Sequence, residues 1–321
     1  MKMVIVAGLA PMAGFTHRAF RRVVSEIGGA QLFFTEMLNS RIVSTQNPEK
    51  DHYCKDARID RPLVAQIVGG DPEVIAAAIK RLEPLGFDAF DINMGCPQRA
   101  IMRHGWGAAL LNDKKRAFLI VEKAKKVTKR PIFVKLRSFP GHRIEPLIEF
   151  SKGLEARGVD LITIHPRAVE DGFKRKAKWE ELKWIKKEIN IPIFGNGDIF
   201  SVEDAEEIFR KTGVNGILIG RGAIVRPWLF WEIVHKRPWP GSPLEVLEKV
   251  VHYILHYSPK EVHRRQLLLF LSWFLRNWEH HLYLFSKVKG WHDPFKILTF
   301  IREEIDKKGL RLVKRPIYSK L

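Results

Sequence analysis

Short apolar runs alternate with longer charged segments along roughly the first two thirds of this 321-residue chain. Eight of the runs have the length and composition of buried strands, and they lie at residues 4–10, 31–37, 62–68, 88–93, 131–137, 160–166, 192–198 and 216–222. Segments with helical periodicity separate most of them, at residues 16–28, 72–86, 113–128, 143–158, 178–189 and 201–213. Asp113 and Ser201 are suited to cap two of these helices, and Pro72 lies near the start of a third.

Strands that alternate with helices pair in parallel, because the chain crosses back over the sheet between them. Eight such units favour a closed α/β barrel of the (β/α)8 TIM type, whose interior eight strands can fill with their own side chains. An open doubly wound sheet is the alternative, and it predicts a GxGxxG turn after the first strand. The sequence there reads LAPMAG, so we predict the barrel.

The pattern changes after the last predicted strand. Residues 226–321 have helical periodicity, and they hold 18 Lys and Arg against nine Asp and Glu, together with six of the nine Trp. The segment PWPGSP at 238–243 has the composition of a linker. We therefore predict a barrel domain over residues 1–235, followed by a smaller all-helical domain over residues 236–321.

Charge and cysteine content narrow the class of protein. The formal net charge of +19 favours a polyanionic partner, nucleic acid above all, although a charge-rich surface without such a partner is the alternative. Cys54 and Cys96 are the only cysteines, which argues against a disulfide-stabilised secreted protein and for a reducing cytoplasm. No run of 18 apolar residues is present, so no membrane span is expected, and a monomer is the default expectation.

Barrel enzymes carry their active sites at the carboxyl ends of the strands. The fourth predicted strand ends in DINMGCPQR, where Gly95 and Pro97 indicate a tight turn around Cys96. The thiol has three possible roles: a small buried hydrophobe, a nucleophile that lacks a nearby base in the sequence, or a general acid. A thiol with an ordinary pKa of about 8.5 still holds its proton at neutral pH, and it could protonate one carbon of a C=C bond while a flavin delivers hydride to the other.

Other strand ends carry candidate cofactor ligands. Lys135 lies in an otherwise apolar strand, where its charge could stabilise a reduced flavin or could simply reach the rim. His165 could bind a cofactor or serve as a structural histidine. The turns GNGD at 195–198 and GRG at 220–222 follow the last two strands, where barrels commonly bind phosphate through backbone N–H groups, although each could be only a tight turn.

Nine motifs occur in order along the chain: LAPMAGFTHRAFR, TEM, AQIVGGDPE, DINMGCP, GWGAALL, FVKLR, IHPR, GNGDI and GRGAIVRPWLF. With them, the chain resembles the tRNA-dihydrouridine synthases over essentially its whole length. The resemblance implies an FMN-binding barrel followed by a helical tRNA-binding domain. It also implies reduction of uridine to 5,6-dihydrouridine in tRNA, with NADPH as the reductant.

The resemblance further implies roles for individual residues. Cys96 matches the general acid that protonates C5 after hydride from flavin N5 has reached C6, and Asn93 and Arg167 match residues near the substrate. The residues that match positions around the flavin or its ribityl phosphate are Pro11, Met12, Ala13, Gln66, Lys135, His165, Asn196, Gly197, Asp198, Gly220 and Arg221.

Two other functions account for part of the sequence. A barrel reductase of the dihydroorotate dehydrogenase kind, acting on a free pyrimidine, shares the phosphate turns and the strand-end lysine but does not need the basic helical region. A non-catalytic RNA-binding barrel does not need Cys96 or Lys135. His252, His256 and His263 lack supporting Cys or carboxylate residues, so we predict no metal site.

Overall fold

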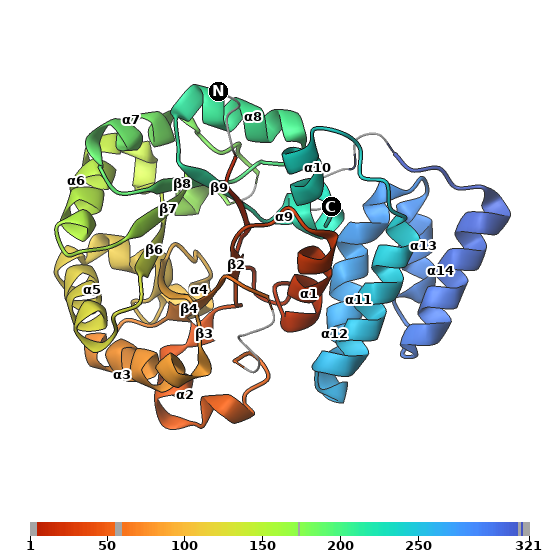
Figure 1. The fold of residues 1–321 in the computed structure, drawn as a ribbon, viewed down its shortest axis with the longest axis horizontal. Helices are drawn as coiled ribbons and strands as arrows, with labels where there is room; N and C mark the ends of the chain where they lie inside the picture. Colours follow the sequence, from red (N-terminus) through yellow and green to blue (C-terminus); the bar gives the residue numbers. More distant parts are fainter. Residues whose placement is uncertain (1–4, 55–59, 173, 314–315, 317–321) are drawn as a thin grey trace.

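The computed structural model describes residues 5–54, 60–172, 174–313 and 316, and it confirms the predicted TIM barrel (Figure 1). Its strands are β1 (Ala7–Leu9), β2 (Phe33–Phe34), β3 (Leu38–Asn39), β4 (Leu63–Val68), β5 (Ala89–Met94), β6 (Ile132–Arg137), β7 (Leu161–His165), β8 (Ile193–Asn196) and β9 (Gly216–Ile219). The strand order is β1-β9-β8-β7-β6-β5-β4-β2, with β3 also beside β4, and all of these pairs are parallel.

The six predicted barrel helices are present, each somewhat shorter than expected: α1 (Arg18–Ile27), α3 (Pro72–Leu82), α5 (Lys114–Val127), α6 (Ile144–Glu155), α7 (Glu180–Glu188) and α8 (Val202–Thr212). Asp113 caps α5 by accepting from the N–H of Arg116 at 3.1 Å, and Ser201 caps α8 by accepting from the N–H of Asp204 at 3.2 Å. The short helices α2 (Ser40–Thr45) and α4 (Arg99–Met102) lie between them, and α9 (Arg221–Val225) and α10 (Leu229–His235) follow α8.

The single strand predicted at 31–37 is wrong in detail, because two short strands replace it. β2 pairs with the start of β4 and β3 with its end. Between them the hydroxyl of Thr35 accepts from the backbone N–H of Gln66 at 3.0 Å and donates to the carbonyl of Glu36 at 2.7 Å. A side chain that takes the place of ladder bonds in this way interrupts the strand.

The barrel closes between β1 and the residues just before β2. The backbone N–H of Leu9 donates to the carbonyl of Leu32 at 2.8 Å, and Gly8 forms a parallel bridge with Leu32. A Cβ on Gly8 would lie 2.9 Å from the side chain of Leu218 and 3.0 Å from the carbonyl oxygen of Leu32. Only glycine therefore allows the two strands to approach closely enough to close the barrel.

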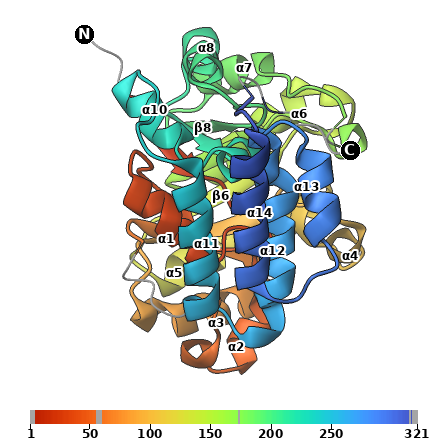
Figure 2. The same cartoon turned by 90° about the vertical axis from the view of Figure 1, so that its right-hand side faces the viewer.

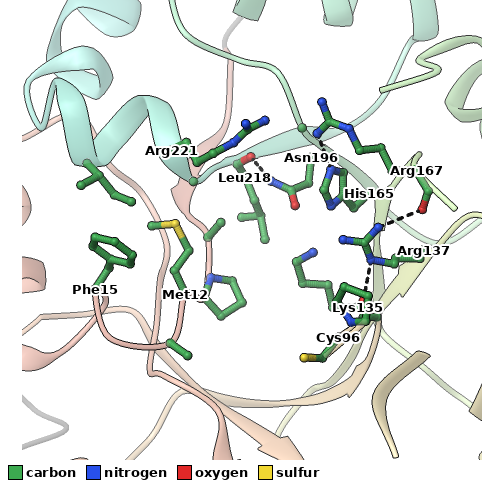
Figure 3. A pocket seen from close by; sticks show the side chains of 18 of the residues that line it. Met12, Phe15, Cys96, Lys135, Arg137, His165, Arg167, Asn196, Leu218 and Arg221 are labelled. Atoms are coloured by element: carbon green, nitrogen blue, oxygen red, sulfur yellow. Dashed lines mark hydrogen bonds between the residues drawn. The ribbon is translucent and has the colours of Figure 1, made fainter. Parts of the chain in front are cut away.

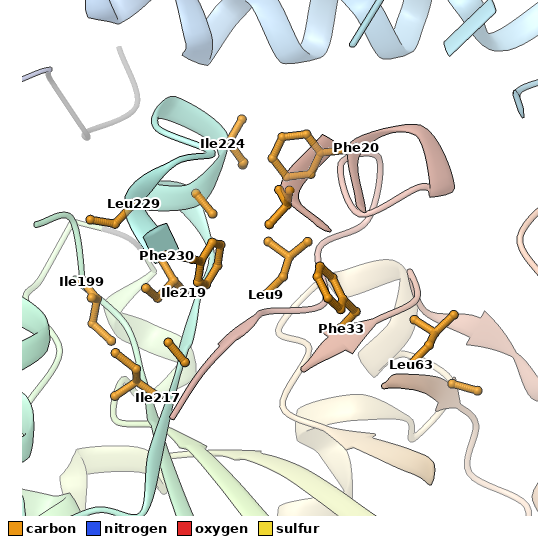
Figure 4. Packing of buried hydrophobic residues seen from close by; sticks show 14 of the residues in the cluster. Leu9, Phe20, Phe33, Leu63, Ile199, Ile217, Ile219, Ile224, Leu229 and Phe230 are labelled. Atoms are coloured by element: carbon orange, nitrogen blue, oxygen red, sulfur yellow. The ribbon is translucent and has the colours of Figure 1, made fainter. Parts of the chain in front are cut away.

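Two apolar clusters hold the fold together. The smaller one lies inside the barrel, and its buried members are Ala10, Phe34, Val64, Ala89, Leu161, Phe194 and Leu218. The larger one lies outside the strands, where residues such as Leu9 and Ile219 face Phe20 of α1 and Phe230 of α10 (Figure 4). Both faces of the parallel sheet are thus covered, as an all-parallel sheet requires.

The remaining helices, α11 (Pro243–Tyr257), α12 (Lys260–Phe274), α13 (His281–Val288) and α14 (Pro294–Lys308), form a layer beside the barrel (Figures 1 and 2). We call α11–α14 the helical region. α11 packs against α1, and Phe270 of α12 also contacts α1, with its ring 5.8 Å from that of Phe20. The larger apolar cluster runs without interruption from the barrel into this layer. Parts of two predictions lie outside the described residues: position 4 of the first predicted strand, and positions 314–315 and 317–321 of the predicted helical domain.

Candidate active site

The inner faces of the barrel strands change from apolar to polar along their length. Successive residues of a strand alternate between its two faces, so a residue two positions beyond an inward-facing one also points inward. The apolar residues inside the barrel include Val64, Ala89, Phe133 and Phe194, and two positions further along the same strands are Gln66, Asp91, Lys135 and Asn196. The barrel therefore has an apolar floor and a polar layer above it.

A cavity of about 340 Å³ opens at the carboxyl ends of the strands (Figure 3). Barrel strands project their last residues toward this end, which explains why the strand-end motifs of the sequence meet here. All the predicted catalytic, cofactor and substrate residues line it: Pro11, Met12, Ala13, Gln66, Asn93, Cys96, Lys135, His165, Arg167, Asn196, Gly197, Asp198, Gly220 and Arg221.

Cys96 lies in a turn after β5 that is held from three sides. The side-chain oxygen of Asn93 accepts from the backbone N–H groups of Gly95 and Cys96, at 3.1 and 2.9 Å. Arg137 Nε donates to the carbonyl of Gly95 at 2.8 Å, and the N–H of Ala108 donates to the carbonyl of Cys96 at 3.0 Å. The backbone on both sides of the thiol is therefore fixed by the protein itself.

The environment of the Cys96 thiol favours its protonated form. The residue is 9% exposed, and burial raises its pKa above the ordinary value, although a backbone hydrogen bond and the charges of Arg137 and Lys135 act in the opposite direction. A thiol that keeps its proton at neutral pH is suited to act as an acid and poorly suited to attack as a thiolate. Of the three roles open to Cys96, the environment therefore argues against the nucleophile.

Lys135 brings a buried positive charge to the same cavity (Figure 3). It lies on β6 beside Asn93 of β5. Burial lowers the pKa of Lys135 to about 8, with the charge of Arg137 acting in the same direction and that of Asp91 opposing it. The ammonium form predominates at neutral pH, and a poorly solvated cation of this kind stabilises an electron-rich or anionic group placed next to it.

His165, the last residue of β7, is held in its neutral form. Burial lowers the pKa of His165 well below its ordinary value, and the positive charges of Lys135 and Arg137 add to the effect. Nη1 of Arg167 lies 3.0 Å from Nε2 of the ring. Because a guanidinium group can only donate, Nε2 accepts this hydrogen bond and the ring proton lies on Nδ1.

Asp198 organises the end of the cavity formed by the loops after β8 and β9. Its carboxylate accepts from Arg167 Nη2 at 2.5 and 2.6 Å, from Arg221 Nη2 at 2.9 Å and from the backbone N–H of Ala177 at 2.8 Å. Charge-assisted bonds of this kind are short and directional. Asp198 therefore fixes two arginines at one end of the site.

Arg167, predicted near the substrate, makes its hydrogen bonds within the protein. Besides Asp198 and His165, its guanidinium binds the carbonyl of Arg175, to which Nε donates at 2.7 Å. Arg167 is only 2% exposed. The structure thus places it in the cavity wall and gives it a supporting position behind His165 and Asp198.

The glycine turns give close access to the backbone at this end. Gly197 has a φ of +111°, and a Cβ there would lie 2.7 Å from the ring of His165. A Cβ on Gly220 would lie 3.1 Å from the sulfur of Met12. The side chain of Asn196 is anchored by its bond to the carbonyl of Leu218 at 2.7 Å. Rigid turns without side chains form the kind of cradle that binds a phosphate through backbone N–H groups.

Comparison with known proteins identifies the group to which this architecture belongs. The sequence profile of the dihydrouridine synthase family matches residues 8–295, which include all the barrel strands except the first residue of β1 and most of the helical region. The chain belongs to the dihydrouridine synthase family.

Two relatives are identical to this chain at about a third of the aligned positions. The chain is 34% identical over 248 residues to tRNA-dihydrouridine synthase B of Pseudomonas aeruginosa, covering 76% of this chain and 74% of the relative. It is 30% identical over 306 residues to a probable tRNA-dihydrouridine synthase of Rickettsia conorii, covering 92% of both chains.

Two solved structures share the fold at low sequence identity. A 2-naphthoyl-CoA reductase bound to 2-naphthoyl-CoA superposes with a TM-score of 0.60 at 13% identity, over 73% of this chain and 50% of the reductase. TcOYE with pHBA superposes with a TM-score of 0.55 at 10% identity, over 73% of this chain and 90% of that one. The chain thus spans half the length of the first structure, and both similarities concern the fold alone.

In this member of the dihydrouridine synthase family, the helical region also contributes to the cavity. Trp273 of α12 lines it, and the guanidinium of Arg276 lies 4.2 Å from the centre of the indole ring. No sequence signal pointed to this contact, because an aromatic residue in a periodic helix is more often a core residue. Other lining residues without an assigned role in the sequence analysis include Phe15, Met37, Arg137, Phe200 and Ile224.

The described residues form neither a metal-binding cluster nor a membrane-spanning helix. Within the ranges 5–54, 60–172, 174–313 and 316, no group of three or more His, Cys, Asp or Glu side chains is arranged to hold a metal ion. In the same part of the chain, none of the helices has the combination of length and apolarity needed to span a membrane.

Proposed function

We propose that this enzyme binds FMN in the cavity, accepts electrons from NADPH and reduces specific uridines of tRNA to 5,6-dihydrouridine. Family membership supports a flavin-dependent oxidoreductase. The observation that carries the proposal is the position of a protonated Cys96 thiol in the same cavity as the Lys135 ammonium and the glycine turns. Reduction of a conjugated C=C bond needs an acid beside a reducing cofactor, and these residues could provide both the acid and the cofactor site.

The residues of the cavity fit a flavin mononucleotide in size and chemistry. A cavity of about 340 Å³ is within the range of ligand pockets. In our assignment Asn196, Gly197, Gly220 and Arg221 hold the ribityl phosphate, with Asp198 fixing Arg221 from behind. Lys135 and His165 face the isoalloxazine ring, and Pro11, Met12, Ala13 and Gln66 complete its surroundings.

When bound, FMN supplies the hydride for C6 of the uracil ring. The Cys96 thiol holds a proton and donates it to C5, so that a hydride and a proton together saturate the C5=C6 bond and leave a thiolate. The thiolate then regains a proton from solvent. Asn93 orients the turn that carries the thiol, and Arg167 supports His165 and Asp198, so we place both residues next to the substrate site as supports of its walls.

The helical region is our candidate for holding tRNA. Residues 226–321 carry twice as many basic as acidic residues, and the polyanionic substrate must present a flipped-out base to the barrel. We accordingly assign catalysis to residues 1–235, tRNA binding to residues 236–321 and the cytoplasm as the location. For the full-length protein, tRNA affinity measured by fluorescence anisotropy should fall steeply with salt, because phosphate contacts release counterions.

The direct test uses purified enzyme, an unmodified tRNA transcript and either NADPH or NADH. We expect a yellow protein that contains FMN, faster flavin reduction by NADPH, and dihydrouridine in the transcript by mass spectrometry. Free uridine and orotate serve as competing substrates. Reduction of a free pyrimidine, with the transcript left unmodified, would contradict the proposal in favour of the small-molecule reductase.

A further inference from the structure

A line of buried polar side chains runs beneath the Cys96 turn. Asp91 and Gln66 face each other across β5 and β4, and Gln66 Nε2 donates to Asp91 Oδ2 at 2.6 Å. The oxygen of the same Gln66 amide accepts from Asn93 Nδ2 at 2.9 Å. Asn93 in turn accepts from the N–H groups of Gly95 and Cys96. Three hydrogen-bonded side chains thus connect the barrel interior to the backbone that carries the thiol.

The line has a direction that Asp91 sets. Burial raises the pKa of Asp91 to about 7, so the carboxylate predominates at mildly alkaline pH, and a carboxylate only accepts hydrogen bonds. Its neighbour Gln66 must then turn its NH₂ toward Asp91 and its oxygen toward Asn93. Asn93 must for the same reason turn its oxygen toward the turn. The two backbone N–H groups of the turn favour the same orientation of Asn93, so Asp91 and the turn anchor the line from opposite ends. Without an acceptor at position 91, Gln66 Nε2 loses its partner, and the middle of the line is held from one end only.

Burial makes these bonds effective. Asp91 is 0% exposed, Gln66 1% and Asn93 6%, so water competes little for their donors and acceptors. Asp91 itself does not line the cavity, whereas Gln66 and Asn93 do. Any influence of Asp91 on the reaction must therefore pass through its neighbours.

We propose that Asp91 is a positioning residue, which fixes the amides of Gln66 and Asn93 and thereby holds the Cys96 turn in the position from which the thiol reaches the substrate. The inference rests on the proposed function. The competing explanation is that Asp91 acts only as a countercharge for Lys135, which lies on the neighbouring strand β6. The two explanations differ in what a neutral acceptor at position 91 would do.

The experiment compares Asp91→Asn, which removes the charge but keeps an acceptor, with Asp91→Leu, which removes both. Thr163→Val is the matched control, because Thr163 is equally buried on β7 and its hydroxyl has no hydrogen-bond partner among the described residues. Gln66→Met removes the hydrogen bonds in the middle of the line without changing a residue of the turn. It is the second test of the line, and it replaces Asp91→Leu if that variant fails to fold. All variants are studied at about pH 8, where the carboxylate predominates.

The first measurement is amide hydrogen exchange of Gly95 and Cys96, which does not depend on activity. We expect exchange to rise about tenfold or more in Asp91→Leu and Gln66→Met, and to remain near wild type in Asp91→Asn and Thr163→Val. Wild-type exchange in both Asp91→Leu and Gln66→Met would overturn the inference. Equal increases in Asp91→Asn and Asp91→Leu would show that the charge is what matters, and would overturn it as well.

The second measurement separates the two half-reactions. Flavin reduction by NADPH should be retained in Asp91→Leu, whereas reoxidation of the reduced flavin by tRNA should slow about 10- to 100-fold, since a small displacement of a reacting group has effects of that order. Equal slowing of both half-reactions would contradict a specific effect on the thiol. If tRNA fails to reoxidise even the wild-type flavin, the proposed function fails, while the exchange measurement still tests the hydrogen-bonded line.

Discussion

Arg137 and Gly95 join the ends of two neighbouring strands through a hydrogen bond of 2.8 Å from Arg137 Nε to the carbonyl of Gly95. The same guanidinium donates from Nη1 to the carbonyls of Arg167 and Ala168, at 3.3 and 3.2 Å. One buried side chain therefore ties the Cys96 turn to the loop that follows β7. Burial and the nearby charge of Arg167 lower the pKa of Arg137 to about 10, so it stays charged at neutral pH.

Replacing Arg137 by Met should loosen the Cys96 turn while keeping most of the side-chain volume. We expect tRNA-dependent reoxidation of the flavin to slow by about tenfold or more, because the thiol loses one of its backbone anchors. The exposed Arg143, on the loop after β6, gives the control variant Arg143→Met. Wild-type rates in Arg137→Met, measured by stopped-flow absorbance, would remove this contact from the mechanism.

The Cys96→Ala variant should separate acid catalysis from cofactor binding. Flavin content and flavin reduction by NADPH should be retained, whereas dihydrouridine formation should fall about 100-fold or more, the usual effect of losing a positioned acid. Cys54, which is 1% exposed and belongs to the core, provides the control Cys54→Ala. Near-normal dihydrouridine formation by Cys96→Ala would show that another group donates the proton.

Arg221→Ala and Asn196→Ala should weaken the retention of FMN. The first substitution removes a positive charge from the proposed phosphate site, where Arg221 is held by Asp198. The second removes the hydrogen bond from the Asn196 side chain to the carbonyl of Leu218. We expect the dissociation constant for FMN to rise about tenfold or more, since each change removes a polar anchor. Arg210→Ala, on the exposed face of α8, controls for the loss of an arginine. Full flavin occupancy after extensive dilution would argue against this assignment.

The pKa of Lys135 predicts how the flavin reduction potential depends on pH. The group is charged below about 8 and neutral above it, so its stabilisation of a negatively charged reduced ring is lost as the pH rises through that value. Lys135→Met should therefore have a lower potential than wild type at about pH 6.5 and a similar one at about pH 9.5. A constant difference across this range, measured by dye equilibration, would contradict a titrating Lys135.

The barrel and the helical region should unfold together. Phe270 of α12 is 2% exposed and contacts Phe20 of α1, so Phe270→Ala should cost about 3 to 5 kcal/mol in the free energy of unfolding. Phe295→Ala, at a position 64% exposed on α14, should change the free energy of unfolding little. Urea unfolding followed by circular dichroism and by tryptophan fluorescence should give one coincident transition. Two separated transitions would show that the domains are independent.

Alternation along the chain was sufficient to predict the barrel. Parallel strands buried on both faces form apolar runs, and the helices between them have their own period and their own caps, as at Asp113 and Ser201. The prediction was less accurate at residues 31–39, because the hydroxyl of Thr35 replaces backbone bonds between β2 and β3. Such a replacement depends on the neighbouring strand, and a single run of residues does not reveal it.

The order of residues along the chain was enough to predict the strand-end part of the active site, since parallel barrel strands bring their carboxyl ends to one face and the motifs at those ends include Cys96 and Lys135. How these residues are connected depends on contacts that form only in the folded protein. The bonds from Asp91 through Gln66 to Asn93 cross between two strands, and Trp273 enters the cavity from a helix far along the chain. Periodicity determines the face on which a side chain lies, whereas partners and directions follow from barrel closure and helix packing, which bring distant residues within hydrogen-bonding distance.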